Sequence, residues 1–390
     1  MKRILAIVAC MVIIFFAMTF LAKGCVISLG VRMGACAAFV VGASVLWFVE
    51  YLQSKGTLAT AGSRKKSSFD WGMHYFRAFA ILAIMGTHYA GAFGYTKLVR
   101  VALTSSTIFF LFISGYLCQY IDSRRRDSPL GYYRKKLLNV ICPFILFSIV
   151  FGFVKGIAGF NFDFLSKILL GEVQGQYWYI PFVTGLFLVS PLICQMDNKN
   201  LILTLAISFL AFLIFPFRPG GFALAWPHTF YLYTYFSVFY IVGFVYCRFK
   251  ESIDGAIKPY WYVFALFGIL LLLMLWCPET LGLKCVDKGL AIALQRFMVL
   301  VCIVLGLGYL KDKKIGVLDN LAKYSFTLYF IHFGLFAQTH AVHDKLINIL
   351  PLPLALSEVL VFALYVAGML VVAMVAKTVL GKFSRSFIGS

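Results

Sequence analysis

The chain has 390 residues, of which 62% are hydrophobic and only 13% are charged. Soluble globular domains carry about 25% charged residues, so this composition excludes a string of soluble domains and predicts one polytopic membrane protein. Lysine and arginine outnumber aspartate and glutamate by 35 to 15, which gives a formal net charge of +20. Because the basic residues collect in short segments between apolar runs, they indicate membrane orientation rather than binding to nucleic acid.

The apolar runs predict an all-α bundle of about twelve transmembrane helices. Residues 1–52 hold the first two as an N-terminal hairpin, and the Gly-, Ser-, Thr- and Lys-rich residues 53–68 predict a flexible cytoplasmic linker. Residues 69–390 hold the other ten helices as one membrane domain. The twelve expected spans are 4–22, 28–49, 71–91, 102–121, 137–157, 177–194, 201–217, 230–247, 260–276, 290–309, 323–338 and 355–379.

The distribution of basic residues predicts the orientation. Lys2 and Arg3 favour a cytoplasmic N-terminus, and the long first run is expected to stay as an uncleaved helix rather than a secretory signal. Strict alternation of twelve spans then places every strongly basic segment on the cytoplasmic side, together with the C-terminus. These segments are 54–68, 123–136, 248–258, 311–323 and the tail that contains Lys382 and Arg385.

Arg77 and His88 both lie within the third expected span. At about 100° per residue, eleven residues rotate a helix by roughly 1,100°, so both side chains share one face, roughly 16 Å apart along the axis. An arginine at the centre of a membrane helix costs about 2.5–3.5 kcal/mol on translocon scales. A cation and an imidazole on one buried stripe therefore indicate a functional site.

Further features follow Arg77 and His88 along the ten-helix region. They are Ser114-Gly115-Tyr116, the basic Tyr133-Arg134-Lys135-Lys136, Gln176-Tyr177-Trp178-Tyr179, and Tyr329 three residues before His332. Their order and the number of spans resemble the acyltransferase 3 family of bacterial inner-membrane acyl transferases, over residues of about 69–380. The arginine and histidine separated by ten residues are the most specific element of the resemblance. Members usually carry an aspartate three residues before that arginine, where this chain has His74, with Asp70 further upstream.

The resemblance implies an integral membrane O-acyltransferase, in particular an O-acetyltransferase, located in the bacterial inner membrane. It implies acetyl-CoA or another acyl-CoA as donor and no metal. It also implies a glycan or lipid-linked saccharide as acceptor, with membrane lipids as the other partner and no nucleic acid. The oligomeric state is not determined by the sequence. A transporter or flippase for a lipid-linked sugar is the alternative, because polar residues within spans also line transport pathways. A non-enzymatic membrane assembly factor is a third possibility.

Three residues are the catalytic candidates. His88 is suited to take a proton from an acceptor hydroxyl or to accept the acyl group itself, although a histidine hydrogen-bonded in a polar core is the structural alternative. Arg77 offers a planar, permanently charged fork to the thioester oxygen or another part of the donor. His332 shares a helix face with Tyr329, which favours catalysis or acceptor binding over packing.

Substrate-binding candidates are Ser114, Trp178, Tyr179 and Tyr329. Ser114 with Gly115 is more typical of a close helix crossing than of a nucleophile. Trp178 and Tyr179 suit stacking on a sugar, but aromatic belts occur at membrane interfaces anyway. The donor-phosphate candidates form a basic cluster that the positive-inside rule and anionic lipids also explain: Arg124, Arg125, Arg126, Arg134, Lys135 and Lys136.

Polar residues near the outer ends of spans carry structural expectations. Arg296 and Glu358 are expected to pair with each other. His340 and His343 with Asp344 lack a third ligand at helical spacing, so no metal site is predicted. Cys277 and Cys285 share a short outer loop in which a disulfide is feasible but undecided.

Overall fold

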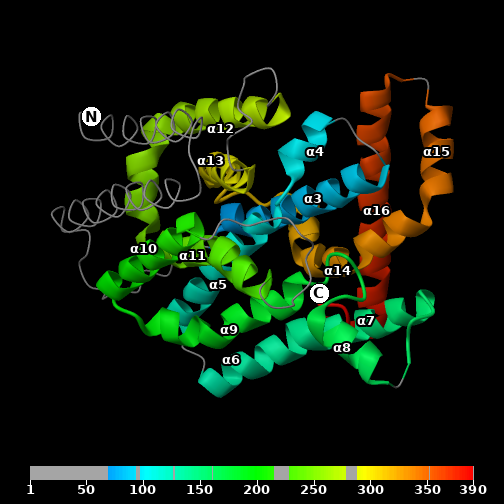
Figure 1. The fold of residues 1–390 in the computed structure, drawn as a ribbon, viewed down its shortest axis with the longest axis horizontal. Coiled ribbons are helices and arrows are strands. Elements are labelled where there is room, and N and C mark those ends of the chain that lie inside the picture. The colour runs from blue at the N-terminus through cyan, green and yellow to red at the C-terminus, as the bar shows by residue number, and fades with distance from the viewer. Residues whose placement is uncertain are drawn as a thin grey trace, which may run out of the picture.

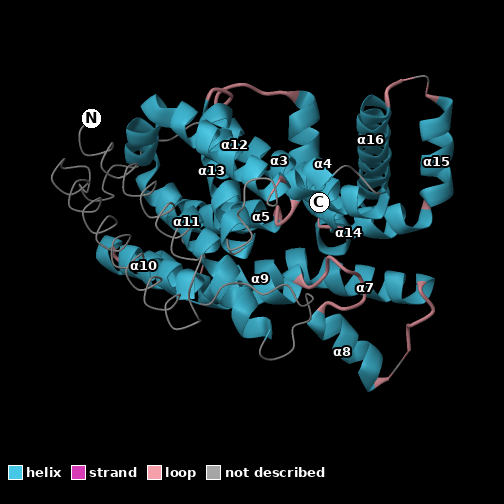
Figure 2. Ribbon diagram, turned by 45° about the horizontal axis from the view of Figure 1, so that its top comes forward, coloured by secondary structure: helices cyan, strands magenta, loops and turns pink. Residues whose placement is uncertain are grey.

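The computed structural model describes residues 69–93, 97–125, 128–159, 161–214, 228–277, 288–350 and 352–389. Within these ranges the regular segments are all helical and none is a strand, which confirms the all-α class (Figure 2). The predicted N-terminal hairpin and its linker lie outside the described residues. The longer helices are α3 (Trp71–Phe93), α5 (Thr107–Arg125), α7 (Cys142–Val154), α9 (Tyr179–Gln195), α10 (Asn198–Ile214), α11 (His228–Ile257), α12 (Trp261–Trp276), α13 (Lys288–Gly308), α14 (Gly316–Gln338) and α16 (Leu354–Leu380).

Shorter helices connect or flank these. They are α4 (Lys97–Leu103), α6 (Pro129–Lys136), the π-helical turn η1 (Leu137–Ile141), α8 (Phe162–Leu170), α15 (His340–Ile349), the 3-10 turns η2 (Lys258–Tyr260) and η3 (Gly381–Phe383), and α17 (Ser384–Phe387).

Six described segments are long and apolar enough to cross a membrane, which supports a membrane-spanning protein. The expected count of about twelve spans is not confirmed. Two expected spans fall into one continuous segment, Leu232–Trp276, and α9 and α10 are apolar but shorter than a full span. Polar residues such as Asp319 and Lys323 lower the hydropathy of α14, which is not among the six. The six segments are Trp71–Phe93, Val99–Ser123, Leu130–Val154, Leu232–Trp276, Gly289–Gly308 and Leu354–Phe387.

Helix α3 lies in the middle of the bundle, with α5, α13 and α14 packed around it (Figure 1). It is apolar on nearly every face, as expected for a helix that is surrounded by others. Buried residues such as Phe76, Ile81 and Met85 are spread over its circumference. Arg77 and His88 are therefore held inside the protein rather than toward lipid.

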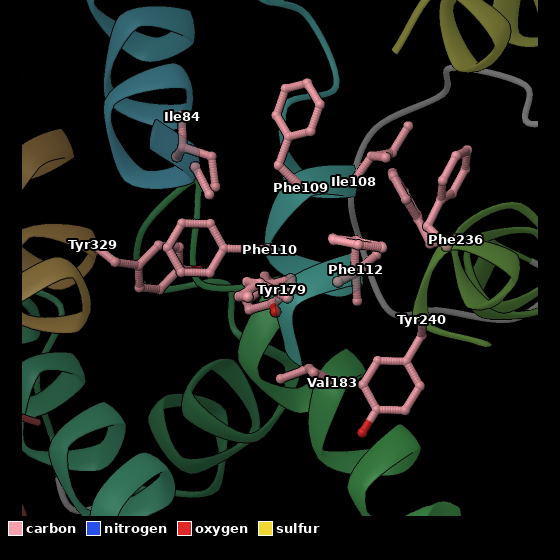
Figure 3. Packing of buried hydrophobic residues seen from close by; sticks show 14 of the residues in the cluster. Ile84, Ile108, Phe109, Phe110, Phe112, Tyr179, Val183, Phe236, Tyr240 and Tyr329 are labelled. Atoms are coloured by element: carbon pink, nitrogen blue, oxygen red, sulfur yellow. The ribbon is translucent and has the colours of Figure 1, made fainter. Parts of the chain in front are cut away.

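Helices α5 and α11 cross at two glycines. A Cβ atom at Gly115 would overlap the backbone oxygen of Tyr240, and one at Gly243 would overlap that of Phe112. The two backbones come this close only because neither glycine has a side chain, as is common in membrane bundles. This confirms the close helix crossing expected at Gly115, and the role of Ser114 stays a prediction. Aromatic rings that include Phe112, Phe236 and Tyr240 fill the surrounding core (Figure 3).

The segment expected to be a cytoplasmic loop before the fifth span is partly helical. Helix α6 begins after Ser128, whose side chain accepts a hydrogen bond from the Gly131 amide at 3.2 Å. The chain then continues through η1 into α7 without a break. Arg134, Lys135 and Lys136 consequently lie on a helix. Turns of π-helix such as η1 often occur near functional sites.

The C-terminal segment belongs to the bundle rather than hanging free. The Thr327 hydroxyl of α14 donates to the backbone oxygen of Ile388 at 2.8 Å. Helix α17 packs against α7 and η1, and the C-terminus lies beside α14 (Figure 1). The tail that the sequence indicates only as a basic extension thus packs against the bundle through Ser384 and Ile388.

The expected pair of Arg296 and Glu358 is wrong. Arg296 donates through Nε to the oxygen of Thr104 at 2.6 Å and through Nη2 to that of Val101 at 2.7 Å. Backbone carbonyls at the end of α4 therefore satisfy its guanidinium. Glu358 is occupied elsewhere, because Oε2 lies 3.1 Å from His343 Nε2 and 3.2 Å from the Tyr89 hydroxyl.

Candidate active site

A cavity of about 400 Å³ lies between α5, α9, α14 and the C-terminal segment. Cationic side chains dominate its charged lining, with Asp122 as the one carboxylate among its described lining residues. The residues that matter below are Arg77 of α3, Ser114 and Cys118 of α5, Lys135 and Lys136 of α6, Tyr179 of α9, Ser325 of α14 and Arg385 of α17.

Arg77 reaches this cavity from the N-terminal half of α3. Its Nη2 donates to the Ser325 hydroxyl at 3.2 Å. Arg385 lines the same cavity, close enough for the two positive charges to repel each other. Among the described residues, neither guanidinium forms an ion pair with a carboxylate. Two like charges that share a cavity favour the binding of an anion.

The basic cluster predicted to hold donor phosphates is divided by the fold. Lys135 and Lys136 line the cavity, and the Lys136 ammonium lies 3.7 Å from the Phe187 ring centroid and 3.8 Å from Cys118 Sγ. Arg134 is exposed and does not line the cavity. Arg124 and Arg125 end α5, but their side chains, like all of Arg126, lie outside the described part of the chain.

The acidic and histidine residues before Arg77 fasten the start of α3. Asp70 pairs with Lys250 of α11 and accepts the Met73 amide at 3.0 Å. His74 Nε2 lies 3.0 Å from Asp319 Oδ1 of α14. These contacts tie α3 to its neighbours. His74 stands at the position where an aspartate is usual in the family that the sequence resembles, and here it contacts Asp319 of α14. The Arg77 guanidinium does not take part in these contacts and faces the cavity.

His88 and His332 lie beside each other although 243 residues separate them in the sequence. Their ring centroids are 5.2 Å apart, and the Phe333 ring packs edge-on to His88 at the same distance. His332 Nδ1 lies 3.0 Å from the Leu328 oxygen. A carbonyl only accepts, so Nδ1 carries the proton and Nε2 presents a lone pair. No described group bonds that Nε2.

Aromatic residues connect the cavity with the two histidines. The Tyr329 ring lies 5.8 Å from Tyr179 and 6.2 Å from Phe110, both of which line the cavity (Figure 3). It also lies 6.1 Å from the His332 ring. The Ser114 hydroxyl is 3.5 Å from that of Tyr179. Tyr329 thus links the cavity-lining Tyr179 with His332, and Ser114 contacts Tyr179.

Trp178 is placed apart from these residues. Its indole is buried, 5.5 Å from the Phe236 ring and 6.0 Å from the Phe182 ring. It does not line the cavity. The neighbouring Tyr179 does, because successive residues at the start of α9 face different directions.

Several polar residues at the site gave no distinct signal in the sequence. Arg385 lies in a short basic tail, which the positive-inside rule already explains. Gln174 lies among glycines and Glu172 without a spacing that predicts chemistry, and Ser325 and Gln176 belong to features of the family resemblance that assign these two residues no role of their own. Among the described residues, no three His, Cys, Asp or Glu side chains gather as a metal site.

A model of the acyltransferase 3 family, described as an acyltransferase domain, matches residues 70–378, which is most of the chain. The chain belongs to the acyltransferase 3 family. It is therefore an acyltransferase. The match covers Arg77, His88 and His332, whereas Arg385 lies beyond it. No curated protein and no solved structure matches the chain.

Proposed function

We propose that this membrane acyltransferase moves an acyl group from cytoplasmic acyl-CoA, in particular acetyl-CoA, to a hydroxyl of a cell-surface glycan or its lipid-linked precursor in the bacterial inner membrane. One observation carries the proposal. Arg77 and His88 share a face of α3, with Arg77 in a cationic cavity and His88 beside a second histidine.

The donor fits the arrangement of charges. Coenzyme A carries a diphosphate and a 3′-phosphate, which suit a cavity lined by Arg77, Arg385, Lys135 and Lys136. Arg77 and His88 stand roughly 16 Å apart along α3, a length comparable with the extended pantetheine arm. With its phosphates near Arg77, the donor would present its thioester near His88.

The chemical step is a direct acyl transfer. The acceptor oxygen attacks the thioester carbonyl carbon, a C–O bond forms and the C–S bond breaks. The hydroxyl proton passes to a histidine nitrogen, for which His332 Nε2 has the free lone pair. The proton then neutralises the departing CoA thiolate. His88 lies where it can share the proton or polarise the carbonyl.

The test uses full-length protein in lipid vesicles with acetyl-CoA labelled in its acetyl group. Wild-type vesicles should release CoA faster than empty vesicles and should acylate glycan extracted from the host. A lipid-linked sugar crossing the bilayer without any CoA release would instead establish the flippase alternative. If neither activity occurs, and variants of Arg77 and His88 change only stability, the protein is an assembly factor.

A further inference from the structure

The segment between α8 and α9, residues 171–178, is irregular backbone packed inside the bundle. Gln174 and Gln176 in this segment are each only 2% exposed. In membrane proteins, non-helical backbone is tolerated where protein covers it or where it lines a polar space. Two glutamines in such a place require an explanation.

Specific contacts hold this segment against α14. The Tyr177 hydroxyl donates to the backbone oxygen of Phe330 at 3.1 Å, and the Tyr329 hydroxyl donates to the backbone oxygen of Gln176. Gly175 packs so closely on Phe333 that an added Cβ would lie 3.0 Å from its ring. Residues 329, 330 and 333 surround His332 on the same helix, so the segment is fixed beside the histidine pair.

Unpartnered polar atoms concentrate at this place. Among the described residues, five buried side-chain nitrogen or oxygen atoms have no hydrogen-bond partner, and four of them belong to this region. They are Gln174 Oε1, Gln176 Oε1 and Nε2, and His332 Nε2. A buried polar group without a partner costs free energy, so native proteins retain few. Their clustering beside a catalytic candidate indicates that a ligand completes their hydrogen bonds.

The segment is separated from Lys135 and Lys136 by the length of α7. Helix α7 follows Lys136 and leads to Lys155, whose ammonium donates to the Val173 oxygen at 2.7 Å. Helix α9 then runs from Tyr179 to Gln195, and both of these residues line the cationic cavity. The donor phosphates would occupy the cavity beside Lys135, Lys136 and Arg385, and the glutamines lie next to the part of α14 that carries His332.

We propose that Gln174 and Gln176 form the acceptor subsite of this enzyme, which binds a polyhydroxylated substrate, a saccharide, through its hydroxyls. This rests on the proposed function. A side-chain amide both donates and accepts hydrogen bonds, as does each sugar hydroxyl, so the two groups complement each other. Bonds to neighbouring hydroxyls would hold the reacting hydroxyl against His332 Nε2.

The experiment compares Gln174→Met, Gln176→Met and the double variant with wild type in the producing cells and in lipid vesicles. In cells, alkali-labile acyl groups on the surface glycan are measured per enzyme molecule. In vesicles, hydrolysis of acetyl-CoA by water is measured without glycan. Ser148→Ala is the matched control, because it removes the fifth unpartnered buried atom from α7.

Glycan acylation should fall about tenfold for each single variant, since each loses hydrogen bonds to the acceptor, while hydrolysis stays within about twofold of wild type. Thermal stability should not fall, because methionine removes an unpartnered polar group. Unchanged glycan acylation would overturn the subsite, and so would an equal loss of hydrolysis and acylation or a loss of stability. If wild-type vesicles release no CoA, the proposed function fails instead.

Discussion

At the scale of single residues, the site depends on which polar groups have a partner. Arg296 donates to the backbone oxygens of Thr104 and Val101 and to the Gln295 side chain, and Glu358 is occupied by His343 and Tyr89. Among the described residues, the Ser325 hydroxyl is the one hydrogen-bond partner of Arg77, and one ring nitrogen of His332 has no partner. Buried polar residues of the first kind stabilise the fold, whereas those of the second kind retain binding capacity for a substrate.

Replacing His88 with alanine should lower the rate of acyl transfer by about 10²–10⁴-fold, the usual effect of losing a positioned acid or base. Abundance and CoA binding should stay near wild type, because the described contacts of the imidazole are two ring contacts. The exposed His340 provides the control, since His340→Ala should leave the rate unchanged. Acyl transfer by His88→Ala at nearly the wild-type rate would remove His88 from the mechanism.

Replacing Arg385 with glutamine should raise the KM for acetyl-CoA about tenfold, because a charge-assisted hydrogen bond to phosphate is lost, with little change in kcat. Lys382→Gln is the matched control: it removes the same charge from the same tail but does not line the cavity. The KM and kcat of wild type and both variants are measured by steady-state kinetics at several salt concentrations. Equal effects of both substitutions would show that only the net charge of the tail matters.

At the scale of secondary-structure elements, two features position the site. Helix α3 holds Arg77 and His88 at fixed spacing, and its N-terminal end is tied by Asp70 and by the backbone bond from the Trp71 amide to the Lys311 oxygen at 3.0 Å. The segment 171–178 returns sharply after α8, because Gly171 ends that helix with φ of +71°. Only glycine adopts this conformation without strain.

Gly171→Ala should destabilise the protein and impair acylation together. Its new Cβ would lie 2.6 Å from the Tyr177 oxygen, and the positive φ adds about 1–2 kcal/mol. Gly156 has a similar φ of +67° but no atom within 4 Å of an added Cβ, so Gly156→Ala should cost only the backbone strain. Thermal unfolding in detergent measures the difference. If both variants unfold at the same temperature, the close return of the chain onto Gly171 is not important for stability.

At the scale of the whole molecule, the fold assembles one continuous arrangement from distant segments. The cationic cavity combines α3, α5, α6, α9, α14 and α17, and the histidine pair joins α3 with α14. Lys135, Lys136 and Arg385 line the cavity, and the Gln174–Gln176 segment lies beside the part of α14 that carries His332. If the basic segments face the cytoplasm, as the positive-inside rule predicts, the proposed acyl transfer would cross the membrane.

Reporter fusions test this orientation. A fusion near Arg125 should report the cytoplasm and one near Asp287 should report the outer side, because strict alternation of the expected spans separates these positions. Alkaline phosphatase, which is active only outside the cytoplasm, and green fluorescent protein, which fluoresces inside, give complementary signals. If both positions report the same side, the twelve-span topology is wrong.

The sequence by itself determined the membrane class, the helical fold and the family, since hydropathy and the Arg77–His88 spacing are local properties of the chain. It also predicted His332 as a site residue, because a histidine within an apolar span is costly. The tertiary structure alone decided which residues meet. The partners of Arg296 and Glu358, the place of Arg385 and the unpartnered glutamines depend on contacts between segments far apart in sequence, and neither periodicity nor composition encodes such pairings.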